Sequence, residues 1–196
     1  VITLGKSSCK TKKTFGSLTI LCNNAGANFR VSFDDQTEGI WHTVTNIGLT
    51  GAFLGIKAAV PAMRRAGGGA IVNMGSLASN RSGGGSPAYG ASKAGIVELT
   101  TPQSAAKSYA SDGIRCNMVS PGHVDTPFIR QDNAHSPNDW PTTIDNPDNY
   151  QRRLDATPLG RLQIPEDIAK AFLFLASDGA SMITRVNLKV DGGAGI

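Results

Sequence analysis

Tyr89 and Lys93 stand four residues apart in the stretch SPAYGASKAGIVELT, residues 86–100. On a helix, residues four apart lie on the same face, so the phenol and the ammonium would point the same way. A phenol titrates near pH ~10, and a neighbouring positive charge favours its ionised form. The pair is therefore suited to general acid or base catalysis by Tyr89, although the same spacing also occurs in helices where both residues only pack.

Ser76 adds a hydroxyl that could hold a substrate oxygen beside the phenol. It follows the apolar run AIVNMG, which predicts a strand, so Ser76 would stand at a strand end. A serine at a strand end, followed by a Tyr and a Lys one helical turn apart, predicts a site that moves a proton at a substrate oxygen.

The elements that position these residues alternate along the chain. Apolar runs predict strands at residues 17–26, 70–76, 113–122 and 186–193, and helical patterns cover residues 34–66, 87–110 and 165–177. Apolar strands separated by helices predict an α/β fold, a parallel sheet covered by helices on both faces. Ligands bind such sheets outside the carboxyl ends of the strands, where the clusters Asn-Asn-Ala-Gly, Gly-Ser and Ser-Pro-Gly would converge.

Between Thr126 and Pro158 the periodicity disappears. A long irregular segment inside a compact domain is usually functional or mobile. We therefore interpret residues 127–157 as a lid over the substrate, with a disordered insertion as the alternative.

Composition excludes several classes of function. The 196 residues suit one compact domain, and the net charge of +4 includes one basic cluster, Lys6, Lys10, Lys12 and Lys13, without interleaved aromatic residues. We therefore predict no nucleic-acid partner. The most apolar stretch, GAFLGIKAAVPAM, is interrupted by a lysine and a proline, and no secretory signal is evident, so we expect a soluble, cytoplasmic protein without a membrane span.

The cysteines do not predict a metal site. Cys9, Cys22 and Cys116 lack C-x-x-C spacing, and two of them fall in predicted strands. Buried, reduced thiols are expected rather than a disulfide framework or a zinc site.

Taken together, the motifs resemble those of the classical short-chain dehydrogenases/reductases. The resemblance covers residues 15–193 and rests on these stretches: NNAG at 23–26, TNIGLTGAF at 45–53, IVNMGS at 71–76, YGASK at 89–93, GIRCNMVSPGHVDTP at 113–127 and VDGG at 190–193. It implies a Rossmann-like, doubly wound dinucleotide-binding domain over residues 1–196. It also implies an oxidoreductase that transfers a hydride between NAD or NADP and a carbonyl or secondary alcohol substrate.

The resemblance also implies roles for individual residues. Tyr89 would be the proton donor or base, Ser76 would polarise the substrate oxygen, and Lys93 would lower the phenol's pKa and hold the nicotinamide ribose. Asn46 would bend its long helix and hold a water that connects Lys93 to solvent. Besides Tyr89 and Lys93, the residues implied to contact the cofactor are Asn24, Ala25, Gly26, Pro121, Gly122, Val124 and Thr126.

Two neighbours of these residues, His123 and Asp125, have no partner at triad or metal spacing and are interpreted as turn residues. A homo-oligomer, a tetramer or a dimer, is the family's usual assembly. The runner-up function is a catalytically silent relative that binds or regulates.

The chain departs from the family pattern at its start. No glycine-rich phosphate loop precedes residue 17, so part of the N-terminal βαβ half is missing from the sequence. Either residues are omitted, the protein is a truncated form, or it no longer binds a dinucleotide, and we expect the first. Two smaller departures are Pro102, which should kink its helix, and Arg185, which stands where the family usually has Gly.

Overall fold

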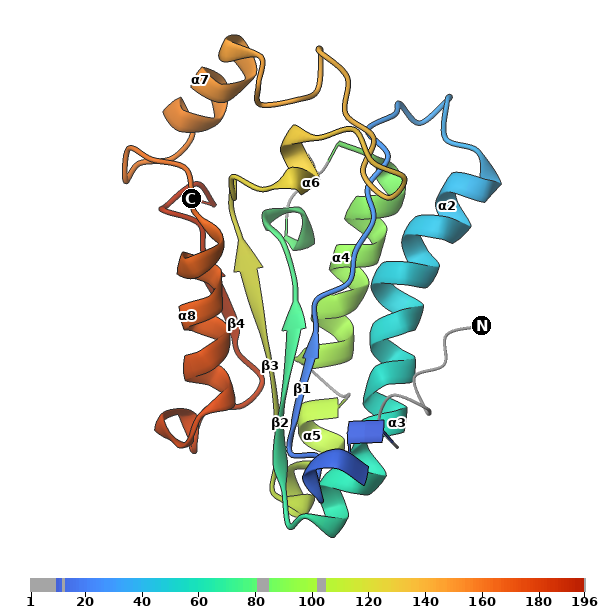
Figure 1. Ribbon diagram of the computed structural model, residues 1–196, viewed down its shortest axis with the longest axis vertical. Helices are drawn as coiled ribbons and strands as arrows, with labels where there is room; N and C mark the ends of the chain where they lie inside the picture. The colour runs from blue at the N-terminus through green and yellow to red at the C-terminus, as the bar shows by residue number, and fades with distance from the viewer. Residues whose placement is uncertain (1–9, 12, 81–84, 102–104, 196) are drawn as a thin grey trace.

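The protein forms one parallel sheet with helical crossovers (Figure 1). The computed structural model describes residues 10–11, 13–80, 85–101 and 105–195. The strands lie in the order β1-β2-β3-β4, and their bounds are β1 Ile20–Asn23, β2 Gly69–Met74, β3 Ile114–Pro121 and β4 Asn187–Val190. Every neighbouring pair is parallel. The predicted Rossmann-like α/β fold is confirmed.

The core lies against the two central strands. Ile71 and Val72 of β2 and Cys116 and Met118 of β3 are fully buried. Such continuous burial is what the largely apolar runs predicted, since these strands are covered on both faces.

One face of the sheet is covered by the long helix α3 (Gly51–Arg65), by α4 (Pro87–Thr100) and by the short α5 (Ala105–Ser108). The other face carries α8 (Pro165–Ala176), which packs on β2, β3 and β4. Helices therefore cover both faces, as predicted. The turns between elements include the short helices η2 Leu77–Ser79, η3 Ala110–Asp112 and η4 Asp178–Ala180.

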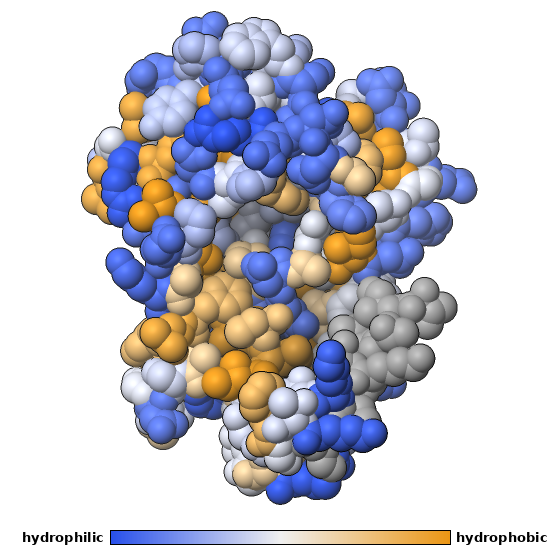
Figure 2. Space-filling model, in the orientation of Figure 1, coloured by the Kyte–Doolittle hydropathy of each residue, from blue (hydrophilic) through white to orange (hydrophobic). Residues whose placement is uncertain are grey.

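Strand β1 is less covered than its neighbours. Leu21 packs toward α3, so Ile20 and Cys22 face the α8 side, where Ile20 is 48% exposed and Cys22 is also exposed. Figure 2 shows apolar surface on this face below a hollow, with mostly hydrophilic surface above it. The prediction of a buried thiol holds for Cys116 and is wrong for Cys22, because no described helix covers β1 on this side.

The first long helix has an irregular middle. Helix α2 (Glu38–Thr45) begins at Thr37, whose hydroxyl accepts from the Ile40 amide, and continues into a π-helical turn, η1 (Asn46–Thr50), before α3. The helix ends where Gly67 and Gly68 adopt positive φ angles. The predicted irregularity near residues 46–51 is therefore present as a π-turn.

The stretch Glu38–Arg65 is also long and apolar enough, by length and composition, to cross a membrane. Here its apolar face packs inside the fold: Ile56, Val60 and Met63 share a buried cluster with Ile71 of β2. A core helix passes the same test of length and composition, so we assign this helix to the core.

Helix α4 begins at a strong cap. Ser86 accepts a hydrogen bond from the Tyr89 amide, and Pro87 occupies the first turn. The predicted helix over 87–110 is found as α4 and α5. Pro102, Lys6, Cys9 and Lys12 lie outside the described residues.

Residues 127–157 contain two helices, α6 (Pro127–Arg130) and α7 (Pro147–Asp155), where the sequence predicted none. Asn146 caps α7 and Pro147 follows it, a start signal that the search for apolar periodicity overlooked. Buried amides fix the segment: Asn138 Nδ2 donates to the carbonyl oxygens of Phe128, Gln131 and Ser136. Figure 1 shows the segment above the carboxyl ends of β2 and β3.

Candidate active site

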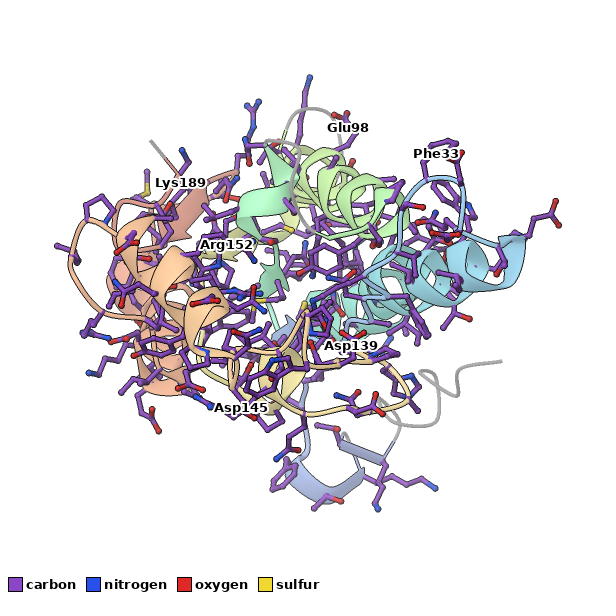
Figure 3. The ribbon with its side chains drawn as sticks, turned by 90° about the horizontal axis from the view of Figure 1, so that it is seen from above. Phe33, Glu98, Asp139, Asp145, Arg152 and Lys189 are labelled. Atoms are coloured by element: carbon purple, nitrogen blue, oxygen red, sulfur yellow. The ribbon has the colours of Figure 1, made fainter. Side chains whose placement is uncertain are left out.

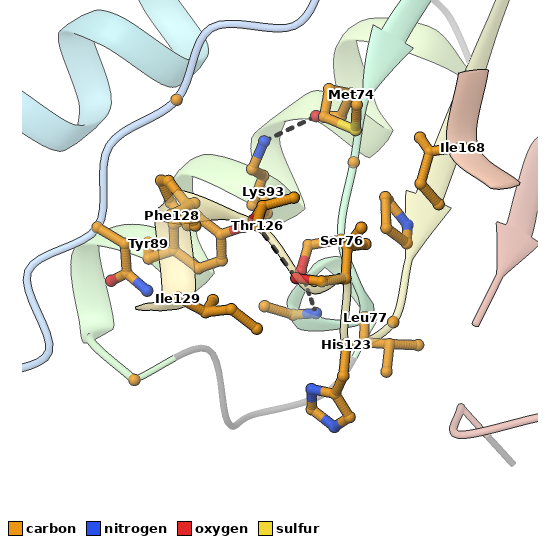
Figure 4. A pocket seen from close by; sticks show the side chains of 18 of the residues that line it. Met74, Ser76, Leu77, Tyr89, Lys93, His123, Thr126, Phe128, Ile129 and Ile168 are labelled. Carbon is orange, nitrogen blue, oxygen red and sulfur yellow. Dashed lines mark hydrogen bonds between the residues drawn. The ribbon is translucent and has the colours of Figure 1, made fainter. Parts of the chain in front are cut away.

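A cavity of about 1140 Å³ opens at the carboxyl ends of the strands (Figure 4). Its walls come from the ends of β1, β2 and β3, from α4 and α8, and from segment 127–157. This is where open parallel sheets bind ligands, because the loops that follow the strands diverge there. The volume slightly exceeds the usual range for small-molecule sites, roughly 300 to 1000 Å³.

Ser76 and Tyr89 meet in this cavity. Ser76 follows β2 and caps η2, where its hydroxyl accepts from the Ala78 amide at 3.1 Å. Tyr89 projects from the first turn of α4, and a side-chain hydrogen bond joins it to Ser76 (Figure 4). Two residues from separate elements thus place two hydroxyl groups together, as their types and spacing predicted.

The Tyr89 phenol is held neutral. Burial raises its pKa, and the hydrogen bond with Ser76 and the positive charge of Arg30 oppose this rise. A neutral phenol can donate a proton to a substrate oxygen. The cation that opposes the rise is Arg30, and the effect of Lys93 on this pKa, which the family resemblance implied, stays a prediction.

Lys93 lies behind the tyrosine. Its side chain is buried, its Nζ donates to the Met74 carbonyl oxygen at 2.8 Å, and it lies 5.6 Å from the centre of the Tyr89 ring. Burial lowers the pKa of Lys93 to about 8. A Cβ on Gly26 would lie 3.8 Å from this Nζ, so the small residue after β1 borders the same space.

Asn46, which was predicted to bend its helix and hold a water beside Lys93, lies outside the cavity. Asn46 is exposed, does not line the cavity, and has Thr50, whose hydroxyl donates to its amide oxygen, as a partner. The residue of η1 that faces α4 is Gly48, whose Cβ, if present, would collide with Ser92 Oγ. Two residues along a helix correspond to a rotation of about 200°, so Asn46 points away from Lys93.

The residues predicted to contact the cofactor are brought together. Asn24, Gly26, Pro121, Gly122, Val124 and Thr126 line the cavity with Tyr89 and Lys93. Ala25 lies between two lining residues but does not line the cavity itself. The set combines an amide, an ammonium and hydroxyls around a space large enough for a nicotinamide and its ribose, so these residues fit that part of a dinucleotide.

No group of three or more His, Cys, Asp or Glu side chains within the described part of the chain could hold a metal ion. Asp125, interpreted from the sequence as a turn residue, pairs with Arg130 at 2.7 Å. His123, interpreted in the same way, lines the cavity (Figure 4).

Sequence reasoning missed the three arginines that line the cavity: Arg30, Arg152 and Arg153. Arg30 follows β1, and the other two lie on α7. No motif marks them, since the fold brings them together from segments more than 100 residues apart. The only signal in the sequence was a pair of adjacent arginines in the aperiodic segment.

Comparison with known proteins identifies the family. The family model described as enoyl-(acyl carrier protein) reductase matches residues 6–195. A solved structure from Burkholderia xenovorans, described as a short-chain dehydrogenase/reductase, superimposes with a TM-score of 0.84 at 31% identity, over 97% of this chain and 69% of that one. The chain belongs to the short-chain dehydrogenase/reductase family.

Within this short-chain dehydrogenase/reductase family, two curated relatives are similar over most of the chain. The cis-4-hydroxycyclohexanecarboxylate dehydrogenase of Sinomonas cyclohexanicum is 41% identical over 91% of the chain and 66% of its own length. The 2,5-dichloro-2,5-cyclohexadiene-1,4-diol dehydrogenase of Sphingobium indicum is 35% identical over 92% of the chain and 66% of its own length. The chain thus spans about two thirds of the length of these relatives.

Proposed function

We propose that this protein is an NAD- or NADP-dependent oxidoreductase acting on a small carbonyl or secondary alcohol substrate. The observation that carries the proposal is the meeting of Ser76, Tyr89 and Lys93 in one cavity at the carboxyl ends of the strands. The similarity to two dehydrogenases of ring alcohols supports it.

In the proposed reaction, Tyr89 carries the proton. During reduction the phenol donates its proton to the carbonyl oxygen, and during oxidation the phenolate takes it from the alcohol. Ser76, already hydrogen-bonded to Tyr89, holds the same substrate oxygen and polarises it. A bound nicotinamide would supply or accept the hydride. Lys93 stabilises the phenolate once the proton has left and, with its free N–H groups, holds the nicotinamide ribose.

The proposed cofactor residues divide by their position. Asn24 and Gly26, with Ala25 between them, follow β1 and would contact the adenosine half. Pro121, Gly122, Val124 and Thr126, at and after the end of β3, would contact the nicotinamide. Asn46 is left out of the proposed machinery because its side chain is exposed.

The alternative, a catalytically silent relative, is less well supported. A protein that only binds or regulates has no need for a buried lysine beside a buried tyrosine, since each buried charge or hydroxyl costs desolvation energy. We therefore favour the enzyme.

The decisive experiment removes one oxygen atom. Tyr89→Phe should lower turnover of NADH or NADPH with a panel of cyclic ketones by about 10²-fold or more, with cofactor affinity retained. Tyr109→Phe is the matched control, because Tyr109 packs against the core beside α3 and does not line the cavity. Unchanged turnover in Tyr89→Phe would reject the proposal.

We further propose that the protein is soluble and cytoplasmic and assembles as a homo-oligomer, a dimer or a tetramer. Exposed Phe53 and Leu54 on α3 would suit a helix-to-helix interface. Light scattering of the purified protein measures its mass directly, and a monomer at micromolar concentration would contradict this assembly.

A further inference from the structure

Three arginines line the part of the cavity that segment 127–157 helps to form. Arg30, Arg152 and Arg153 all line it. Burial lowers the pKa of Arg153, and the positive charges of Arg152 and Arg30 act on it in the same direction, so the three groups lie near one another. Figure 3, which looks down on this end of the molecule, places Arg152 toward the middle of the view. The cavity therefore carries a concentrated positive charge near its outer wall.

No acidic side chain balances this charge. Among the described residues none of the three arginines forms an ion pair with Asp or Glu, and no Asp or Glu is found among the residues described as lining the cavity. Their hydrogen bonds go to neutral oxygens. Arg152 donates to Asn149 Oδ1 at 2.8 Å, and Arg153 donates to the Asn149 carbonyl oxygen at 3.1 Å.

Holding these positive charges close together costs free energy, and a bound anion would remove that cost. Burial lowers the pKa values of Arg30 and Arg153, which means that both guanidinium groups are partly desolvated. Like charges that are desolvated together repel one another unless a counter-charge enters. A guanidinium offers five N–H groups in a fixed fork, so donors remain for a carboxylate.

The arginines belong to the side of the cavity where the substrate would bind. Arg30 Nη2 donates to the Phe128 carbonyl oxygen at 3.2 Å, and the Phe128 ring lies 6.3 Å from that of Tyr89. The charge of Arg30 also acts on the Tyr89 phenol. The residues proposed to contact the nicotinamide come from the end of β3 and the turn after it, whereas Arg30 follows β1 and the other two arginines lie on α7.

We propose that the substrate carries an anionic group, a carboxylate being the best geometric match, and that Arg30, Arg152 and Arg153 bind it while Tyr89 acts on the hydroxyl or carbonyl of the same molecule. This inference rests on the proposed oxidoreductase function for its kinetic consequence. The presence of the anion site itself does not depend on turnover.

The kinetic test compares matched substrates. Keto acids of four to eight carbons and their primary amides differ in charge but little in size. We expect the intact protein to prefer the acids, and Arg153→Gln to lower the ratio of kcat/KM for acid over amide about tenfold or more. Arg153→Lys should restore part of this preference. Arg65→Gln, which removes an exposed charge at the end of α3, should leave the ratio unchanged.

A binding test separates the two proposals. Benzoate and benzamide are titrated calorimetrically into wild type and Arg153→Gln, and NADH and NADPH are titrated by fluorescence. Benzoate that binds wild type more tightly than benzamide, and loses about tenfold in Arg153→Gln, supports the anion site even if no ketone is turned over. Turnover without any preference for the acid, or equal binding of benzoate to both proteins, overturns the anion site alone. Weakened NADH and NADPH binding with unchanged benzoate binding would assign the arginines to cofactor phosphates and also overturn it.

Discussion

The Lys93 ammonium lies 5.6 Å from the centre of the Tyr89 ring and donates a 2.8 Å hydrogen bond to the carbonyl oxygen of Met74. The lysine is thus tied to the end of β2, one turn of α4 beyond the tyrosine. Tyr89 is tied to the loop after the same strand through Ser76. The strand end therefore sets the positions of both groups, and small movements of α4 would shift them together.

Lys93 should make stability depend on pH. Burial lowers its pKa from 10.5 to about 8, so between these values the unfolded chain binds a proton that the folded chain does not. The free energy of unfolding therefore gains a contribution that rises with pH from about 8 to 10.5, while below pH 8 the full cost of the buried charge remains. The substitution Lys93→Met removes this pH-dependent contribution to the free energy of unfolding.

We expect the stability of wild type relative to Lys93→Met to increase by up to about 3 kcal/mol across that window. Urea denaturation of both proteins without cofactor, at pH 7, 8, 9 and 10, measures it. Arg65→Met is a suitable control, because an arginine stays charged throughout. A gap between wild type and Lys93→Met that does not change with pH would contradict the buried, depressed lysine.

Asn46 should be dispensable for turnover. Its side chain is exposed, and among the described residues its hydrogen-bond partner is the Thr50 hydroxyl. We expect Asn46→Ala to change kcat/KM by less than about twofold, as for other surface substitutions that touch no special feature. Thr50→Ala, which removes the other half of the same contact, is the matched control. A loss of about 10²-fold in Asn46→Ala alone would restore its predicted catalytic role.

The fold and the chemistry differ in how far the sequence reveals them. The ends of β2 and β3 were predictable because both strands are largely apolar and buried along most of their length. Ser76, Tyr89 and Lys93 were predictable because their spacing fits a strand end followed by one turn of a helix. Asn46 lies outside the cavity. A family resemblance locates a stretch of sequence, whereas a difference of two residues along a helix selects the opposite face of that helix. Arg30, Arg152 and Arg153 were invisible because only the folding of segment 127–157 over the sheet brings them together.

The close approach of η1 to α4 leaves no room for a side chain at position 48. A Cβ on Gly48 would collide with Ser92 Oγ but would lie 3.7 Å from Ser92 Cβ, an ordinary contact. We expect Gly48→Ala to destabilise the protein by about 1–3 kcal/mol, because it overpacks a buried contact. Adding Ser92→Ala removes the colliding oxygen and should recover most of the loss. Thermal unfolding of the single and double variants checks this, and a double variant no more stable than Gly48→Ala would show that the collision lies elsewhere.

Among the residues that the structure describes, Arg185 is the one non-glycine residue with a positive φ, 69°. It stands in the turn before β4. The left-handed conformation costs an L-residue with a Cβ about 1–2 kcal/mol, which explains why a Gly was expected there. Arg185 Nε also donates to the Thr101 carbonyl oxygen at 2.8 Å, an exposed hydrogen bond that contributes less. Arg185→Gly should therefore stabilise the protein by about 0.5–1 kcal/mol in urea denaturation. Arg185→Ala loses the same hydrogen bond but keeps the Cβ, so it should be less stable than wild type. Equal stabilities for the Gly and Ala variants would show that the backbone conformation at this turn carries no cost.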